Sequence, residues 1–500
     1  MSMAILNLST DVQKFLSEPK KLFIGGEWVE PSSKSYFPVE NPADLSHFAQ
    51  VSTAVEQDVD AAVGAAKAAF EGEWSHVQPQ ERSKLMLKLA DLIEADRENL
   101  AQIISLENGK PYTNAFHGEV TITANIIRYF AGWPSKIEGS TIPVSPRGGQ
   151  KMLNYTTKEP VGVCALIVPW NFPLSMCAWK LGPALATGCT SVLKPAEQTP
   201  LSAIRLAELF AKAGFPKGVF NVLTGFGDRA GAPLAAHKDV DKIAFTGSTQ
   251  VGRLIAQAAV GNMKKVSLEL GGKSPNIIMP DADIIKAAKG SADGIFYNQG
   301  QVCTAASRLY VHESVLDQTL EELAKHAASH IVGPGLDPET TMGPLVSQAQ
   351  HKIVTGYVDK ALNEGAELIC GGKVPSGLGD GYFMEPTVFL DKQEQACISK
   401  EEIFGPVLTV MSWHDVEELV FRANDSPFGL AAGVWTQNLQ QAHTVAARLK
   451  AGSVWINCWN VVDPASPFGG YKQSGWGREM GKNVIDAYTE TKSVFIDLSE

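Results

Sequence analysis

The stretch KIAFTGSTQVG, residues 242–252, carries the strongest fold signal of this sequence. It opens with a short apolar run, passes through Gly247, and leads into TQVGRLIAQAAV, whose apolar residues recur at helical spacing. A strand that turns through glycine into a helix is the repeating unit of parallel α/β sheets, and such a helix start offers backbone N–H groups to phosphate. The glycine spacing is not that of the GxGxxG fingerprint, so an ordinary tight turn stays open as the alternative.

Three further apolar runs of this kind lie upstream: VGVCALIVP from residue 161, TSVLKP from 190 and FNVLTG from 220. Helical segments such as LSAIRLAELFAKAG separate them, and this alternation predicts a parallel α/β sheet. Helical periodicity dominates residues 55–130, and a second α/β series opens near residue 273 with SPNIIMPDAD. The terminal ETKSVFIDLS is expected to form a strand of the kind through which subunits pair.

Composition narrows the class of protein. A chain of 500 residues with 44% hydrophobic and 19% charged residues is typical of a globular protein with two or three domains. The net charge of −11, without a lysine or arginine run, argues against nucleic acid or an anionic membrane as a partner.

The apolar runs are shorter than the roughly 20 residues of a membrane helix, and we expect no secretory signal and a cytoplasmic location. Seven scattered cysteines without a CxxC or Cys/His cluster predict free thiols and no metal site.

The stretch NQGQVCTAAS, residues 298–307, surrounds Cys303 with glycine, glutamine and small residues. A buried, inert cysteine is the simplest interpretation, since unpaired cysteines are among the most buried side chains. However, glycine and two glutamines are poor core material. Residues 304–307 are expected to open a short helix, whose dipole would favour a reactive thiolate.

Two further motifs carry polar groups of kinds that take part in catalysis. In VPWNFPLSMCAWK, Asn171 precedes Pro173, which suits the first turn of a helix, so the asparagine amide is free to point outward. In SLELGGKSP, Glu269 ends an apolar run just before two glycines. A carboxylate there is ordinarily paired or solvated, whereas a desolvated one has the raised pKa of a general base.

Two more motifs hold groups that suit a nucleotide. In VLKPAEQTP, Lys194 and Glu197 follow a strand and could hydrogen-bond a ribose, although a solvated polar loop fits equally. In EEIFGPV, Glu402 stands before an apolar run. A nucleophilic thiol, an amide donor, a carboxylate base and a nucleotide site together suit the oxidation of a carbonyl through a thioester.

At this point the sequence resembles the aldehyde dehydrogenase superfamily, from FIGGEWV to ETKSV. Seven motifs occur in the family's order: PWNFP, LKPAEQTP, FTGSTQVG, LELGGKSP, NQGQVC, EEIFGPV and PFGGYKQSG. The segments DGIFYNQGQVCTAASRLYVHESVLD and NPADLSHFAQV add a narrower resemblance to bacterial phenylacetaldehyde dehydrogenases. The resemblance implies oxidation of an aldehyde to its acid with NAD and without a metal.

The resemblance also implies roles for individual residues. Cys303 corresponds to the nucleophile, Asn171 to the side-chain donor of the oxyanion hole, and Glu269 to the general base. Lys180 and Glu479 correspond to a pair that relays protons from that base. Cofactor contacts are implied for Trp170, Gly247 and Ser248 at the pyrophosphate, for Lys194 and Glu197 at the adenine ribose, and for Glu402 and Phe404 at the nicotinamide riboside.

The positions that correspond to the family's substrate tunnel are aromatic or apolar for the most part. They are Phe172, Met176, Trp179, Phe296, Val302, Thr304, Trp459, Val461 and Phe468. Without a basic residue to hold a second carboxylate, this wall favours an aromatic aldehyde such as phenylacetaldehyde. A broad aliphatic range, or a quaternary ammonium substrate such as betaine aldehyde, is the alternative. Glu197 should repel a 2′-phosphate, which favours NAD over NADP.

The fold implied by the resemblance is α/β throughout, with a Rossmann-like cofactor domain, a second α/β catalytic domain and a β oligomerisation arm. The expected boundaries are 1–137 and 157–272 for the NAD-binding domain, 273–471 for the catalytic domain, 138–156 and 487–500 for the arm, and 472–486 for a return segment. A homotetramer built from dimers is expected, with a dimer as the alternative.

Three other functions compete with this interpretation. In the CoA-acylating branch of the family, coenzyme A resolves the thioester, but the presence of Glu269 argues against that branch. A hydrolase that uses the same thiol on esters would need no nicotinamide cofactor. A binding or structural protein with an inactive site would be expected to have lost one of the three catalytic positions, and all three are present.

Overall fold

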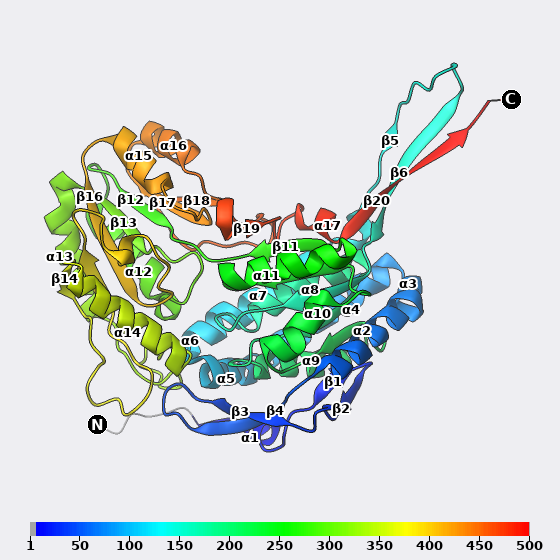
Figure 1. Ribbon diagram of the computed structural model, residues 1–500, viewed down its shortest axis with the longest axis horizontal. Coiled ribbons are helices and arrows are strands. Elements are labelled where there is room, and N and C mark those ends of the chain that lie inside the picture. Colours follow the sequence, from blue (N-terminus) through cyan, green and yellow to red (C-terminus); the bar gives the residue numbers. More distant parts are fainter. Residues whose placement is uncertain (1–6, 500) are drawn as a thin grey trace.

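The turn at Gly247 joins strand β10 (Lys242–Thr246) to helix α11 (Thr249–Ala259), which confirms the strand–turn–helix unit predicted for this stretch. The computed structural model describes residues 7–499. Figure 1 shows two lobes, each built around a sheet, and a narrow arm that projects from the larger lobe.

The sheet of the larger lobe has eight strands in the order β19-β11-β10-β7-β8-β9-β1-β2. Its other strands are β7 (Val163–Ile167), β8 (Thr190–Lys194), β9 (Phe220–Val222), β11 (Lys265–Glu269), β19 (Gly475–Trp476), β1 (Leu22–Ile24) and β2 (Glu27–Val29). The strands from β11 to β9 are parallel to one another, whereas β19, β1 and β2 pair antiparallel. All four predicted strands are confirmed, because parallel strands covered on both faces read as short continuous apolar runs.

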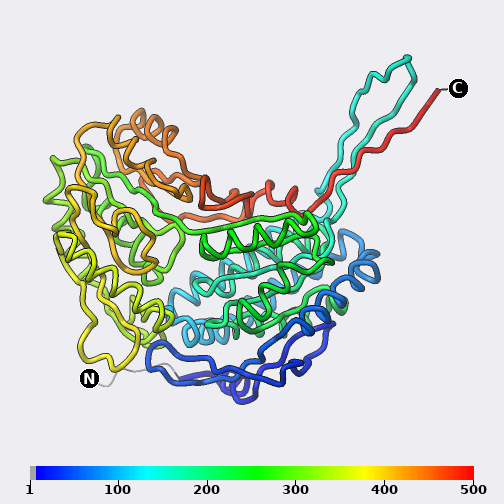
Figure 2. Tube along the Cα trace, viewed as in Figure 1, coloured from blue at the N-terminus to red at the C-terminus, as the bar shows by residue number. Residues whose placement is uncertain are grey.

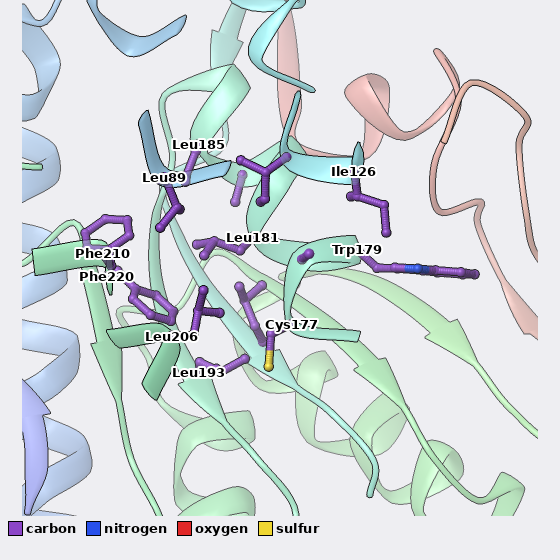
Figure 3. Close-up of a cluster of buried hydrophobic side chains, with 14 of the residues drawn as sticks. Leu89, Ile126, Cys177, Trp179, Leu181, Leu185, Leu193, Leu206, Phe210 and Phe220 are labelled. Carbon is purple, nitrogen blue, oxygen red and sulfur yellow. The ribbon is translucent and has the colours of Figure 1, made fainter. Parts of the chain in front are cut away.

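Helices cover both faces of this sheet. They are α2 (Glu56–Glu71), α3 (Glu73–His76), α4 (Pro79–Ala95), α5 (Arg97–Asn108), α6 (Tyr112–Asn114), α7 (Thr121–Ala131), α8 (Ser175–Thr187), α9 (Leu201–Ala213) and α10 (Ala232–Ala236). Helix α8 is buried at every residue, because α4 and α7 pack over it against the sheet. Figure 3 shows Leu89, Leu181 and Leu206 meeting in this core, while the Trp179 ring extends away from them.

The second lobe holds a seven-stranded sheet in the order β14-β15-β16-β13-β12-β17-β18, as predicted from residue 273 onward. Its strands are β12 (Pro275–Ile278), β13 (Arg308–His312), β14 (Glu367–Cys370), β15 (Thr387–Leu390), β16 (Val407–Trp413), β17 (Ala431–Trp435) and β18 (Ser453–Ile456). Only β14 pairs antiparallel. Its helices are α12 (Ile284–Phe296), α13 (Leu316–Ala328), α14 (Gln348–Asn363), α15 (Val416–Asn424) and α16 (Leu439–Arg448).

The arm is an antiparallel sheet of β5 (Thr141–Ile142), β6 (Met152–Pro160) and β20 (Thr489–Asp497), which confirms the predicted terminal strand. In Figure 2 the C-terminal segment runs beside the cyan hairpin, far from the body of the molecule. Before it, helix α17 (Val484–Ala487) packs near β11.

A two-stranded ribbon of β3 (Tyr36–Glu40) and β4 (His47–Ser52) and helix α1 (Thr10–Leu16) complete the N-terminal part. Within residues 7–499, no helix is long and apolar enough to cross a membrane.

Candidate active site

A cavity of about 490 Å³ is lined by residues of both lobes at the carboxyl ends of β10 and β11. Ligands of parallel α/β sheets bind at this edge, where strands end and helices begin. Cys303, Asn171 and Glu269 all line the cavity, although they are far apart in the sequence. The tertiary structure therefore brings the three predicted chemical groups into one space.

Cys303 lies in a turn between a 3-10 segment (Tyr297–Gly300) and strand β13. The expectation of a short helix at residues 304–307 is wrong. The Ala306 N–H donates to the carbonyl of Gly294 (3.1 Å), and Arg308 already belongs to β13, so the turn at Cys303 leads directly into the sheet. No helix dipole acts on the sulfur from this side, and the thiol depends on other groups for its ionisation.

Burial, and then the charges of the nearby carboxylates Glu269 and Glu402, raise the pKa of the Cys303 thiol to about 12. Both effects disfavour the thiolate, because they oppose a negative charge on sulfur. A cation bound in the cavity would act in the opposite sense. The thiol is therefore protonated at neutral pH unless a positive charge lies close to it.

Asn171 lies in the turn between β7 and α8, two residues before Pro173. The helix begins at Ser175, slightly later than the sequence predicts. The Asn171 side-chain amide donates to the backbone carbonyl of Gln301 (2.9 Å), in the segment that carries Cys303. One N–H of this amide is thereby used to orient the group, and the second N–H is left for a ligand in the cavity.

Glu269 is the last residue of β11 and is almost fully buried. Neither of its carboxylate oxygens has a hydrogen-bond partner within residues 7–499. Burial, and then the charge of Glu479, raise the pKa of Glu269 well above its ordinary value, whereas Lys180 acts in the opposite direction. An unpaired carboxyl with a raised pKa, beside a thiol, has the properties of a general base.

Lys180 and Glu479 form a fully buried ion pair next to this base. Lys180, on α8, also donates to the hydroxyl of Thr246 (2.7 Å), the residue opposite Glu269 on β10. The second carboxylate oxygen of Glu479 has no partner among the described residues. The two charges of the pair thus act on the pKa of Glu269 in opposite directions.

Two glycines let the carboxylate of Glu402 and the Cys303 turn approach β11. The Gly272 N–H donates to Glu402 (2.9 Å), and a side chain at Gly271 would overlap that carboxylate. Burial raises the pKa of Glu402 to about 7, which the Gly272 N–H opposes. Glu402 therefore titrates near neutral pH, at the wall of the cavity.

Gly272→Ala tests this close approach. An added Cβ would lie 2.5 Å from the Cys303 carbonyl oxygen, so the nucleophile turn must shift. We expect the free energy of unfolding to fall by about 1 to 3 kcal/mol and kcat/KM to fall about 100-fold. Thermal melting and the rate of NADH formation measure the two effects. Gly261→Ala is the matched control, since no atom lies within 4 Å of its added Cβ; equal activity losses in the two variants would contradict the assignment.

The predicted cofactor residues fall into two groups. Trp170, Gly247, Ser248, Glu402 and Phe404 line the cavity. The Trp170 and Phe404 rings meet edge to face, with centroids 5.3 Å apart. Lys194 and Glu197 are outside this lining, at the end of β8, where their charged groups are 3.7 Å apart.

The residues present fit a dinucleotide. Ser248 caps α11 by accepting from the Val251 N–H (3.2 Å), which leaves other N–H groups of the first turn free for phosphate oxygens. The Thr249 hydroxyl, in the same turn, is buried without a hydrogen-bond partner among the described residues. Aromatic rings and a carboxylate line the adjoining wall.

Six of the nine predicted tunnel residues line the cavity: Phe172, Met176, Trp179, Val302, Thr304 and Phe468. The other three are placed elsewhere, which corrects the expectation. Phe296 is buried in the core of the second lobe against His330. Trp459 lies behind the wall and donates to the Thr304 carbonyl (3.2 Å), and Val461 is 63% exposed.

Other residues that the sequence motifs did not indicate also line this wall, among them Gly118, Glu119, Ile122, Ser175, Tyr297, Gln350, Asn460 and Val462. Several of them are sequence neighbours of residues that were predicted. Tyr297 follows Phe296 at the point where α12 ends, so its ring leaves the helix direction and stacks near Phe172 at 6.2 Å. Asn460 has a positive φ of 55°, and it lines the cavity together with Val462, whereas Val461 between them is exposed.

The fold and the site define an oxidoreductase of the α/β class with a cysteine at a dinucleotide site. The model of the aldehyde dehydrogenase family matches residues 28–494. The protein DhaS of Bacillus subtilis is 51% identical over 100% of both chains. An aldehyde dehydrogenase of Bacillus cereus in complex with NAD+ is 50% identical with a TM-score of 0.97, covering 99% of this chain and 100% of that chain. AldA of P. syringae, an indole-3-acetaldehyde dehydrogenase solved with NAD+ and IAA, is 42% identical with a TM-score of 0.94, over 98% of each chain.

The chain therefore belongs to the aldehyde dehydrogenase family. It is an NAD-dependent oxidoreductase, as the NAD+ complexes among its structural relatives indicate.

Proposed function

We propose that this protein oxidises an aldehyde to its carboxylic acid through a thioester on Cys303. The observation that carries the proposal is the presence of Cys303, Asn171 and Glu269 in one cavity, beside the dinucleotide-binding wall. NAD, when bound, supplies the acceptor for the hydride of the aldehyde carbon. The protein's own residues supply the nucleophile, the hydrogen-bond donors and the base.

The chemistry begins when the Cys303 thiol loses its proton to solvent and the thiolate sulfur forms a bond to the carbonyl carbon, as the C=O π bond opens. The resulting oxyanion is held by the Asn171 side-chain amide and the Cys303 backbone N–H, and the loss of one such donor costs about 3 to 4 kcal/mol. Once oxidised, the carbon is held as a thioester. Glu269 then takes a proton from water, the hydroxide adds to the thioester, and the C–S bond breaks to release the acid and regenerate the thiol.

For the substrate we propose an aromatic aldehyde, with phenylacetaldehyde as the leading candidate. Phe172, Trp179, Tyr297 and Phe468 contribute aromatic rings to the wall, and no lysine or arginine lines the cavity within the described residues. The similarity to an indole-3-acetaldehyde dehydrogenase supports an aryl acetaldehyde. A quaternary ammonium aldehyde is the second candidate, because the same rings could hold a cation.

An aldehyde panel tests this proposal. Purified protein is given phenylacetaldehyde, benzaldehyde, hexanal, betaine aldehyde and succinic semialdehyde, each with NAD or NADP, and NADH or NADPH is followed by absorbance. We expect the highest kcat/KM for phenylacetaldehyde with NAD, because Glu197 disfavours a 2′-phosphate. Higher turnover of another aldehyde would overturn the substrate assignment, and no reduced cofactor from any of them would overturn the activity.

Phe468→Leu tests the aromatic wall. Its ring lines the cavity and meets Trp179 edge to face, with centroids 4.9 Å apart. Removal of the ring should raise KM for phenylacetaldehyde about 10-fold, the equivalent of about 1.4 kcal/mol of lost contact, and leave KM for hexanal nearly unchanged. Phe296→Leu is the matched control, since that ring is buried outside the cavity. A KM for phenylacetaldehyde that stays at its original value in Phe468→Leu would contradict this wall as the aryl site.

We propose a homotetramer in the cytoplasm. Two exposed apolar surfaces support the assembly: Leu153, Phe495 and Leu498 on the arm, and Leu254 and Met263 on and after α11. Exposed apolar patches on separate elements are typical of subunit interfaces. All seven cysteines are free thiols, which supports a reducing compartment.

A further inference from the structure

A buried ion pair between Lys110 and Glu119 lies directly behind the turn that carries Asn171. Both side chains are 0% exposed. Lys110 follows the end of α5, and Glu119 lies in η1, a π-helical segment (Ala115–Val120) that leads into α7. Removal of two charges from water is costly, and their attraction offsets that cost only when further hydrogen bonds complete the pair. The groups that hydrogen-bond to this ion pair therefore indicate which part of the backbone it holds in place.

Those partners lie at the two ends of one turn. The Lys110 ammonium donates to the backbone carbonyl of Asn171 (3.1 Å). A Glu119 carboxylate oxygen accepts from the backbone N–H groups of Leu174 (2.9 Å) and Ser175 (3.2 Å), where α8 begins. The ion pair thus holds the turn at residues 171–175 from both sides. A carboxylate at a helix N-terminus is also favoured by the helix dipole.

The same pair reaches the cavity itself. Glu119 is part of the cavity wall, and the Lys110 ammonium lies 4.1 Å from the ring centroid of Phe172, which also lines the cavity. The side chain of Asn298 donates to the Asn171 carbonyl as well (3.0 Å), so that this oxygen has two donors. The backbone of Asn171 is therefore fixed independently of its side chain, whose amide reaches toward the Cys303 segment. π-Helical turns are rare and are found frequently at functional sites.

We propose that Lys110 and Glu119 are positioning residues that fix the turn at 171–175 and thereby aim the Asn171 amide at the oxyanion of the substrate. This inference rests on the proposed function, because it requires Asn171 to be an oxyanion donor. Neither charged group needs to touch the reacting atoms. The pair acts through the backbone carbonyl of Asn171 and the N–H groups at the start of α8.

A double-mutant cycle with Asn171→Ala separates positioning from a merely structural role. Glu119→Gln keeps an oxygen that can accept from α8 but removes the charge that pairs with Lys110. We expect it to lower kcat about 10- to 100-fold in the wild-type background, because small misplacements of a donor have effects of this size. In the Asn171→Ala background the same change should alter kcat by less than about 2-fold. The affinity for NAD, measured by fluorescence titration, should be the same in all four proteins.

Asp96→Asn is the matched control for loss of a buried ion pair. Asp96 binds Arg205 through two hydrogen bonds of 2.6 Å, and both residues lie outside the cavity wall. We expect this variant to lower the melting temperature and to leave kcat within about 2-fold of the wild-type value. Lys110→Met is a second variant. It removes the charge that pairs with Glu119 but keeps the Glu119 carboxylate, which accepts from the N–H groups at the start of α8. If Glu119→Gln fails to fold, this variant still tests the inference.

The outcomes distinguish this inference from the proposed function. An equal loss of kcat from Glu119→Gln in both backgrounds would show that the ion pair acts independently of Asn171, and would overturn the inference alone. A loss of kcat in Asp96→Asn that matches the loss in Glu119→Gln would also overturn it, since general destabilisation would then explain both. Full activity in Asn171→Ala by itself would overturn the oxyanion role of Asn171, and with it both proposals.

Discussion

Cys303→Ala is expected to abolish NADH formation, with a fall in kcat of about 10⁴-fold or more, as is usual when a nucleophile is removed. The physical reason is that no other thiol lies on the cavity wall within the described residues. Without the sulfur, the aldehyde carbon cannot form the covalent adduct from which the hydride leaves. Binding of NAD should persist, because the helix start at Ser248 that we assign to phosphate does not include Cys303.

Cys370→Ala is the control for this experiment. Cys370 is a half-buried thiol on the edge strand β14, and it is not part of the cavity wall. Its removal should leave the rate of NADH formation unchanged. Substantial aldehyde oxidation by Cys303→Ala, or a matching loss in Cys370→Ala, would refute the thioester mechanism.

Glu269→Gln is expected to lower the steady-state rate by about 10²- to 10⁴-fold, the usual contribution of a general base. The first turnover should be spared, because the base acts after the thioester has formed. Rapid-mixing measurements should therefore show a burst of about one NADH per site, followed by a stalled phase. A steady-state rate close to that of the wild type would show that another group activates the water.

The pH dependence follows from the raised pKa of Glu269. A base works only when it is ionised, and burial shifts its ionisation to a pH above the ordinary carboxyl range of about 4.3. In the wild type, kcat should therefore rise with pH as Glu269 loses its proton, and the part of this rise that Glu269 contributes should be absent in Glu269→Gln. Glu107→Gln is the matched control: Glu107 is also fully buried with a pKa raised to about 8, but it accepts from the Leu201 and Ser202 N–H groups, away from the cavity wall. That variant should retain the full rise of kcat with pH.

The sequence by itself determined four parallel strands of the larger sheet, the start of the second α/β series and the order of the chemical motifs. Short apolar runs that end at glycine are local signals, and the strand–turn–helix at Gly247 formed as predicted because the apolar run, the glycine and the helical spacing after it all lie within a few residues. The identities of Cys303, Asn171 and Glu269 were also visible, because each belongs to a motif read within a few residues. The absence of a helix after Cys303 could not be predicted from the sequence. The pairing of β13 with β12 and the hydrogen bond from Ala306 to Gly294 decided it.

Only the tertiary structure decided which side chains face the substrate and how the groups ionise. Phe296 and Tyr297 are adjacent in the sequence, yet the end of α12 sends one ring into the core and the other to the cavity. Periodicity cannot predict such a change, because it assumes one continuous backbone conformation. The raised pKa of Glu269 and the contacts of Lys110 with Asn171 arise between segments far apart in the chain. Desolvation and ion pairing depend on distances in space, which are established only when the whole chain has folded.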